Sequence, residues 1–186
     1  MSKLILVVLS LFVLGFTSCK KKDEPDPGPQ PKTVSFDLTY SSQMQISGSS
    51  QPHDQEFAIS TPNISTNSAA EFTSHNTSAD RVDSAYITNY NLTIKFPTTQ
   101  TFDLLRWIRS YIESEGSSDF LVQDIDTFMD NGSKVLSFVL PKANFKEAIK
   151  KDNIKAKCVI KLDQGPMDNV TIDVDLGFKV YARENQ

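Results

Sequence analysis

The sequence predicts a mainly β protein, an antiparallel β-sandwich with one or two short helical crossovers. The clearest support is residues 170–180, where Val, Ile, Leu and Phe occupy every second position, with polar residues or glycine between them. This two-residue period is typical of a strand with one buried face and one solvated face. The same period recurs along much of the chain after residue 32. Many strands with one wet face each indicate antiparallel sheets packed against each other.

Six other segments are predicted strands. Each alternates in hydrophobicity or is rich in aromatic and β-branched residues, and each is bounded by Pro, Gly, Asn, Asp or Ser. They are residues 33–40, 56–60, 84–96, 120–125, 134–140 and 154–162. Residues 60–81 are rich in Ser, Thr and Asn and predict an irregular connection, with a single helical turn near 69–72 as the alternative.

Residues 102–116 are ambiguous, because their apolar residues also fit the spacing of a helix. We predict a short turn at 102–106, then a strand that pairs with 120–125, because the Gly116-Ser117-Ser118 turn between them favours a hairpin. Residues 143–153 predict a short crossover helix after Pro141.

The segment 163–169 carries Gly165-Pro166 and Asp168-Asn169. These are turn-forming residues, so the segment predicts a hairpin turn between two long strands. The alternative is a calcium loop, because Asp163, Asp168 and Asn169 could supply oxygen ligands.

The first 18 residues have the layout of a secretory signal peptide, with the single charge of Lys3 before an apolar run from Leu4 to Phe16. A helix over this run would span about 20 Å, which is short of the roughly 30 Å hydrocarbon core of a bilayer. The run ends in Phe16-Thr17-Ser18-Cys19, which resembles the lipobox of bacterial lipoproteins. The resemblance implies that Cys19 is acylated and becomes the mature N-terminus, attached to the membrane by its acyl chains.

Lys22, Asp23 and Glu24 resemble the surface-export signal of Bacteroidetes lipoproteins, which implies display on the outer face of the outer membrane. Prolines then alternate with polar residues and glycine over residues 25–31, a composition that favours extended polyproline II. We therefore expect residues 19–32 to form an acylated cysteine and a tether, and residues 33–186 to form a single β-sandwich domain.

The order of segments from about Asp80 onward resembles a group of Bacteroidetes lipoproteins of unassigned function with immunoglobulin-like β-sandwich domains. The matching features are "VDSAYITNYNLTIKFP", "TFDLLRWIRSYIES", "VLSFVL", "FKEAIKKDN" and "VTIDVDLGFKVYA". The resemblance implies an immunoglobulin-like fold, and the group carries no catalytic motif to transfer.

Composition and motifs argue against several functions. The net charge of −4 does not suggest a nucleic-acid partner. No HExxH, CxxC, GxSxG or P-loop pattern is present, so we predict neither catalysis nor a cofactor. Cys158 lies in the alternating stretch 154–162, which predicts a buried structural thiol in preference to a nucleophile.

Two groups of residues are candidates for binding. Asp124, Asp126 and Asp130 have a spacing loosely like that of a calcium loop. On a strand, Trp107, Arg109 and Tyr111 share one face and could form an exposed recognition patch for a glycan, and the alternative is that Trp107 packs in the core.

These observations predict a noncatalytic binding or adhesion module, lipid-anchored at the outer membrane and facing the cell exterior, with a glycan or a partner protein as ligand. Two alternatives remain open. One is a structural or envelope-assembly lipoprotein that faces the periplasm, and the other is a hydrolase.

Overall fold

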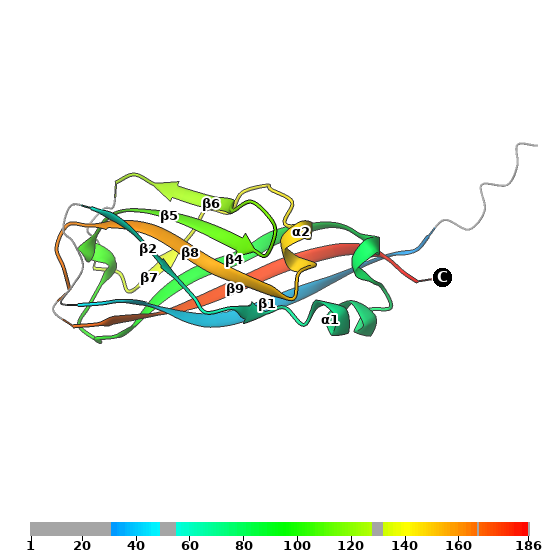
Figure 1. Ribbon diagram of the computed structural model, residues 1–186, viewed down its shortest axis with the longest axis horizontal. Helices are drawn as coiled ribbons and strands as arrows, with labels where there is room; N and C mark the ends of the chain where they lie inside the picture. The colour runs from blue at the N-terminus through cyan, green and yellow to red at the C-terminus, as the bar shows by residue number, and fades with distance from the viewer. Residues whose placement is uncertain (1–30, 49–54, 128–131, 167, 186) are drawn as a thin grey trace, which may run out of the picture. The chain divides into compact units, whose positions relative to one another are not determined.

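The computed structural model describes residues 31–48, 55–127, 132–166 and 168–185 (Figure 1). The predicted signal peptide (residues 1–18), Cys19 and the predicted export signal at residues 22–24 lie outside these ranges, and so does Asp130. Among the described residues, no helix is long and apolar enough to cross a membrane.

The described chain forms two antiparallel sheets, which confirms the mainly β sandwich. Sheet A has the strand order β1-β9-β4-β7, and sheet B has the order β2-β8-β5-β6, with β3 also paired to β8. The strands are β1 (Thr33–Ile46), β2 (Glu56–Ser60), β3 (Ile64–Ser65), β4 (Val82–Phe96), β5 (Leu105–Ser114), β6 (Phe120–Ile125), β7 (Val135–Ser137), β8 (Asn153–Leu162) and β9 (Val170–Arg183).

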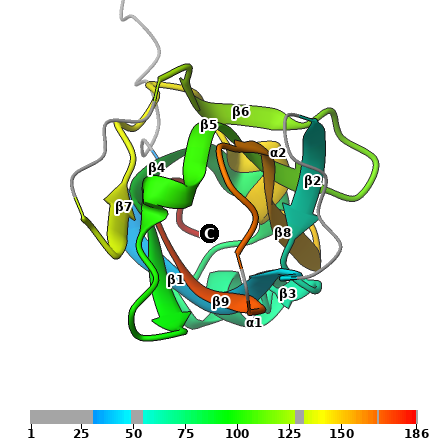
Figure 2. The same ribbon diagram turned by 90° about the vertical axis from the view of Figure 1, so that its left-hand side faces the viewer.

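The pairing of the strands is nested. The central hairpin is β5 with β6, and outside it β4 pairs with β7, β2 with β8 and β1 with β9. Successive pairs in this series lie in alternate sheets, so an antiparallel ribbon is rolled into two layers (Figure 2). This is the strand order of a jelly roll.

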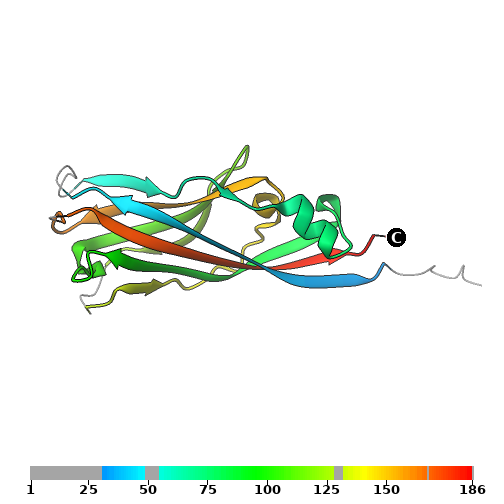
Figure 3. The same ribbon diagram turned by 90° about the horizontal axis from the view of Figure 1, so that it is seen from below.

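The structure therefore does not confirm the immunoglobulin-like arrangement. In an immunoglobulin domain the first two strands are neighbours in one sheet. In this protein β1 pairs with β9 along its whole length, and β2 lies in the other sheet (Figure 3). The resemblance concerned the order of elements along the chain, and that order does not determine which strands pair.

The prediction of a hairpin turn at residues 163–169 is wrong, because turn-forming residues do not determine whether the flanking strands pair. β8 belongs to sheet B and β9 to sheet A, so this segment crosses between the sheets. The N–H of Gly48, just after β1, donates to Asn169 Oδ1 at 3.0 Å. That bond joins the segment between β8 and β9 to the residues just after β1.

Most predicted elements are present with altered lengths. The turn and strand predicted at 102–116 are confirmed, because a 3-10 helix at Phe102–Leu104 leads into β5, which pairs with β6. β1 is longer than predicted and β7 is shorter. The segment 60–81 contains a helix, α1 (Ser68–Ser74), and a short 3-10 helix at Ala79–Arg81.

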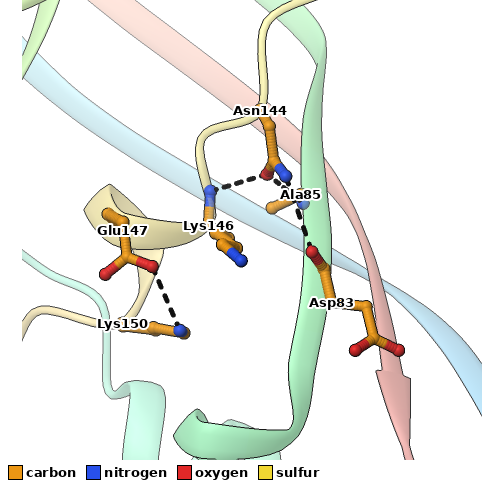
Figure 4. A network of polar contacts seen from close by, with 6 residues as sticks. All are labelled: Asp83, Ala85, Asn144, Lys146, Glu147 and Lys150. Atoms are coloured by element: carbon orange, nitrogen blue, oxygen red, sulfur yellow. Dashed lines mark hydrogen bonds and ion pairs between the residues drawn. The ribbon is translucent and has the colours of Figure 1, made fainter.

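The crossover helix predicted at 143–153 is only the short α2 (Lys146–Ile149), and Asn144 fastens it to β4 (Figure 4). Asn144 Oδ1 accepts hydrogen bonds from the N–H groups of Ala85 and Lys146, both at 3.0 Å. The Phe145 N–H donates to the Ala85 carbonyl at 2.7 Å. Phe145 is buried and packs against Phe120 and Phe178, so this segment closes one end of the core.

Candidate binding surface on the outer face of sheet B

The alternation of β5 puts the predicted recognition residues on the outer face of sheet B. Ile108 and Ile112 are buried between the sheets, whereas Trp107, Arg109 and Tyr111 are partly exposed. Trp107 is thus outside the core, as the recognition-patch prediction requires. We call these three outward residues the β5 row.

Arg109 is held in place by two neighbours. Its guanidinium carbon lies 4.6 Å from the centre of the Trp107 ring, and its Nε donates to Asp124 Oδ2 at 2.8 Å. The hydrogen bond to Asp124, which is paired with Arg109 in the β5–β6 register, raises the pKa of Arg109. The arrangement keeps a permanent positive charge against one face of the indole.

A second cation lies beside Tyr111. The Nζ of Lys157, paired with Tyr111 across the β5–β8 ladder, is 5.9 Å from the centre of its ring. The same Nζ contacts Glu113 Oε1 at 2.7 Å and Asp119 Oδ2 at 3.0 Å. Hydrogen bonds to these two carboxylates raise the pKa of Lys157 to about 12, so Lys157 is charged at neutral pH.

The three aspartates predicted as calcium ligands are not brought together among the described residues. Asp124 is engaged by Arg109, Asp126 is exposed, and Asp130 lies outside the described ranges. Within those ranges no group of three or more His, Cys, Asp or Glu side chains is placed to hold a metal ion.

The described residues also form two polar hollows, which sequence patterns did not reveal. The first has a volume of about 410 Å³ and is lined by Asn63, Glu113, Ser114, Glu115, Asp119, Asn153, Ile154 and Lys155. The second has a volume of about 400 Å³ and is lined by Thr39, Tyr40, Ser41, Ser42, Asn63, Ile64, Ser65, Thr66, Asn67 and Glu71. The only available signal was the Ser, Thr and Asn content of residues 60–81, which is also typical of a plain connection.

Ser114 is an unusual part of the first hollow. It is 9% exposed, and its hydroxyl is the one buried side-chain polar atom among the described residues that has no hydrogen-bond partner. A buried polar group without a partner costs about 1–3 kcal/mol, so such groups are usually satisfied by a water or a ligand.

Cys158 is a buried thiol, as predicted. It is fully covered, and its Sγ lies 3.4 Å from Ser110 Oγ and 3.7 Å from the Tyr90 hydroxyl. Burial raises the pKa of the thiol, so the thiolate needed for nucleophilic chemistry is disfavoured. Cys158 is therefore a core residue and is not placed to meet a substrate.

Comparison with known proteins does not assign this chain to a family. No protein-family model matches this chain, and no curated protein matches its sequence. One similar solved structure is a BFDV capsid protein in a decamer, 14% identical over 82% of this chain and 100% of that chain, with a TM-score of 0.41.

Two further solved structures are similar to parts of this chain. A BFDV capsid protein in a 60-mer is 8% identical over 83% of this chain and 95% of that one, with a TM-score of 0.40. A structure of Desmodium yellow mottle tymovirus is 11% identical over 88% of this chain and 94% of that chain, with a TM-score of 0.27. These scores are too low to support an inference about function. The fold and the surface together define a jelly-roll sandwich with an exposed row of aromatic and cationic side chains.

Proposed function

We propose that this protein is a noncatalytic binding or adhesion module, anchored through acylated Cys19 at the outer face of the outer membrane. The ligand is a glycan or a partner protein. The lipobox-like residues 16–19 and the Lys22-Asp23-Glu24 sequence support the location.

The observation that carries the proposal is the β5 row. Trp107 and Tyr111 are partly exposed on a sheet, which is a firm support. Each lies beside a cation that is held by at least one carboxylate. Aromatic and arginine side chains are the residues most often responsible for affinity at recognition surfaces. A side chain fixed before binding loses little conformational entropy when the ligand arrives.

The location is tested by protease treatment of intact cells that express the full chain with a C-terminal tag. We expect the tag to be removed without lysis, and lysed cells serve as the control for protease activity. Survival of the tag until lysis would contradict surface display and favour the envelope-assembly role.

The binding surface is tested with two matched substitutions on the full chain. Tyr111→Ala removes a partly exposed aromatic ring from the β5 row, and Tyr181→Ala removes an exposed ring from sheet A. We expect binding of extracellular glycans or of captured surface proteins to fall at least tenfold in Tyr111→Ala, about 1.4 kcal/mol, and to be unchanged in Tyr181→Ala. Equal effects of the two substitutions would refute this surface.

A further inference from the structure

The two polar hollows meet at one residue. Asn63, an exposed residue between β2 and β3, lines both. Each hollow is within the range of about 300–1,000 Å³ that small-molecule sites occupy. The first is also continuous with the β5 row, because Glu113 and Asp119 line it and bind the Lys157 that faces Tyr111. The surface therefore extends from β5 over Asn63 toward β1.

The second hollow is lined almost wholly by hydroxyl and amide groups. Among its lining residues, Thr39, Ser41, Ser42, Ser65 and Thr66 carry hydroxyls, Asn63 and Asn67 carry amides, and the one carboxylate is on Glu71. Hydroxyls and amides both donate and accept hydrogen bonds. An apolar ligand would remove water from these groups without replacing the lost hydrogen bonds, which is unfavourable.

The charges of the first hollow restrict the ligand further. It is lined by three carboxylates, Glu113, Glu115 and Asp119, and by one lysine, Lys155. Lys157 already binds Glu113 and Asp119, so Glu115 is the carboxylate that a ligand can reach as a hydrogen-bond acceptor. A ligand with its own carboxylate or sulfate would meet like charges, and such contacts select against that class of ligand.

Ser114 also lines the first hollow, where most of the other residues are polar. Its hydroxyl is buried and has no hydrogen-bond partner among the described residues. A ligand hydroxyl that reached this group could both donate to it and accept from it, which would remove the cost of the unpaired group.

From these contacts we infer that the two hollows bind adjacent units of an uncharged, hydroxyl-rich oligosaccharide that meets the β5 row at Tyr111. This inference rests on the proposed binding function and narrows its ligand from any glycan or protein to a neutral saccharide.

The test titrates the full chain, purified in mild detergent, with two sets of soluble fragments. One set is neutral, from α-glucan, β-glucan, mannan and arabinan, and the other is charged and acidic, from pectate, alginate and hyaluronan. We expect binding of at least one neutral fragment and weaker binding of every charged fragment.

Two variants then place the ligand in the hollows. Asn63→Ala acts on both hollows and Ser114→Ala on the first, and we expect each to weaken binding about fivefold to tenfold, the worth of roughly one hydrogen bond. Neither should lower the melting temperature, because Asn63 is exposed and Ser114 loses an unpaired hydroxyl. Gln45→Ala, at an exposed amide on β1 outside both hollows, is the matched control.

The outcomes separate this inference from the proposed function. If Tyr111→Ala abolishes binding of the neutral fragments while Asn63→Ala and Ser114→Ala retain it, the hollows are not the binding site. The proposed binding function would still hold. Tighter binding of a charged fragment, or no saccharide binding at all, also overturns the inference. The proposed function is then tested by the protease accessibility of the tag on intact cells and by the capture of a protein partner.

Discussion

At the scale of single residues, the core of this sandwich contains a buried polar cluster that links the two sheets. Tyr90 comes from β4 in sheet A, whereas Ser110 and Cys158 come from β5 and β8 in sheet B. The Tyr90 hydroxyl and Ser110 Oγ both lie within hydrogen-bond distance of Cys158 Sγ. Burial raises the pKa values of Tyr90 and Cys158, so the cluster is neutral and links the two sheets without charge.

Removing the Tyr90 hydroxyl tests the contribution of this link. We expect Tyr90→Phe to lower the free energy of unfolding by about 1 kcal/mol, the usual worth of a buried neutral hydrogen bond. Urea denaturation measures the change. Tyr86→Phe, at an exposed position, should leave stability unchanged, and equal effects of the two variants would show that the cluster contributes nothing.

Ser114 should respond in the opposite direction. Ser114→Ala removes a buried hydroxyl that has no partner, so we expect the unliganded protein to be as stable as the parent or more stable by up to about 1 kcal/mol. The unfolding midpoint in urea is the measurement. A clear loss of stability would mean that the hydroxyl is hydrogen-bonded in the free protein.

At the scale of elements, the segment before α2 depends on one side chain. β7 pairs only with residues 91–93 of β4, so the β4 edge near Ala85 is bonded by Asn144 and Phe145 instead. The Asn144 oxygen also accepts from the first N–H of α2, at Lys146. A helix of four residues has little stability of its own, so we attribute its position to this contact and to the burial of Phe145.

We expect Asn144→Ala to reduce stability by about 1–3 kcal/mol, because it leaves the N–H groups of Ala85 and Lys146 without their acceptor. Amide hydrogen exchange at these two residues should accelerate. Asn144→Asp keeps an acceptor oxygen and should retain most of the protection. Unchanged exchange in Asn144→Ala would show that water replaces the side chain without cost.

At the scale of the whole molecule, β9 is the strand on which sheet A depends. It lies between β1 and β4 and pairs with both over most of its length. Its inward side chains, Val170, Ile172, Val174, Leu176, Phe178 and Val180, are almost completely buried. β9 thus supplies the centre of sheet A, so the core is completed only when β9 has joined the sheet.

Val174→Asp tests this arrangement by placing an unpaired charge in the core. We expect a loss of several kcal/mol, because a buried carboxylate without a partner is strongly unfavourable. Thr171→Asp, whose side chain is on the partly exposed face of the same strand, should cost far less. Thermal melts of both variants make the comparison.

The proposed attachment to the membrane has its own test. Cys19→Ala removes the thiol that would carry the acyl chain, so we expect the protein to leave the membrane fraction and appear in the soluble fraction. Fractionation followed by detection of a C-terminal tag is the measurement. Continued membrane retention would contradict lipid anchoring.

Much of the fold could be predicted from the sequence because burial follows local alternation. In β5 the alternation of Trp107, Ile108 and Arg109 indicated an outward β5 row once the segment was taken as a strand, although core packing of Trp107 stayed open until the structure placed it. Cys158 was placed in the core by the same pattern. The hollows could not be predicted, because Asn63, Ser114 and Thr39 come from separate strands and connections with no shared local pattern.

By itself, the sequence determined which segments are strands and which side of each strand is buried, because both depend on neighbours two residues away. Only the tertiary structure decided that β1 pairs with β9, that residues 163–169 cross between sheets, and that Asn63 joins two polar hollows. Many strands with similar alternation could pair with one another, and the pairing that forms is the one that packs the whole core. For that reason a jelly roll and an immunoglobulin-like sandwich look alike when only the local pattern of the chain is considered.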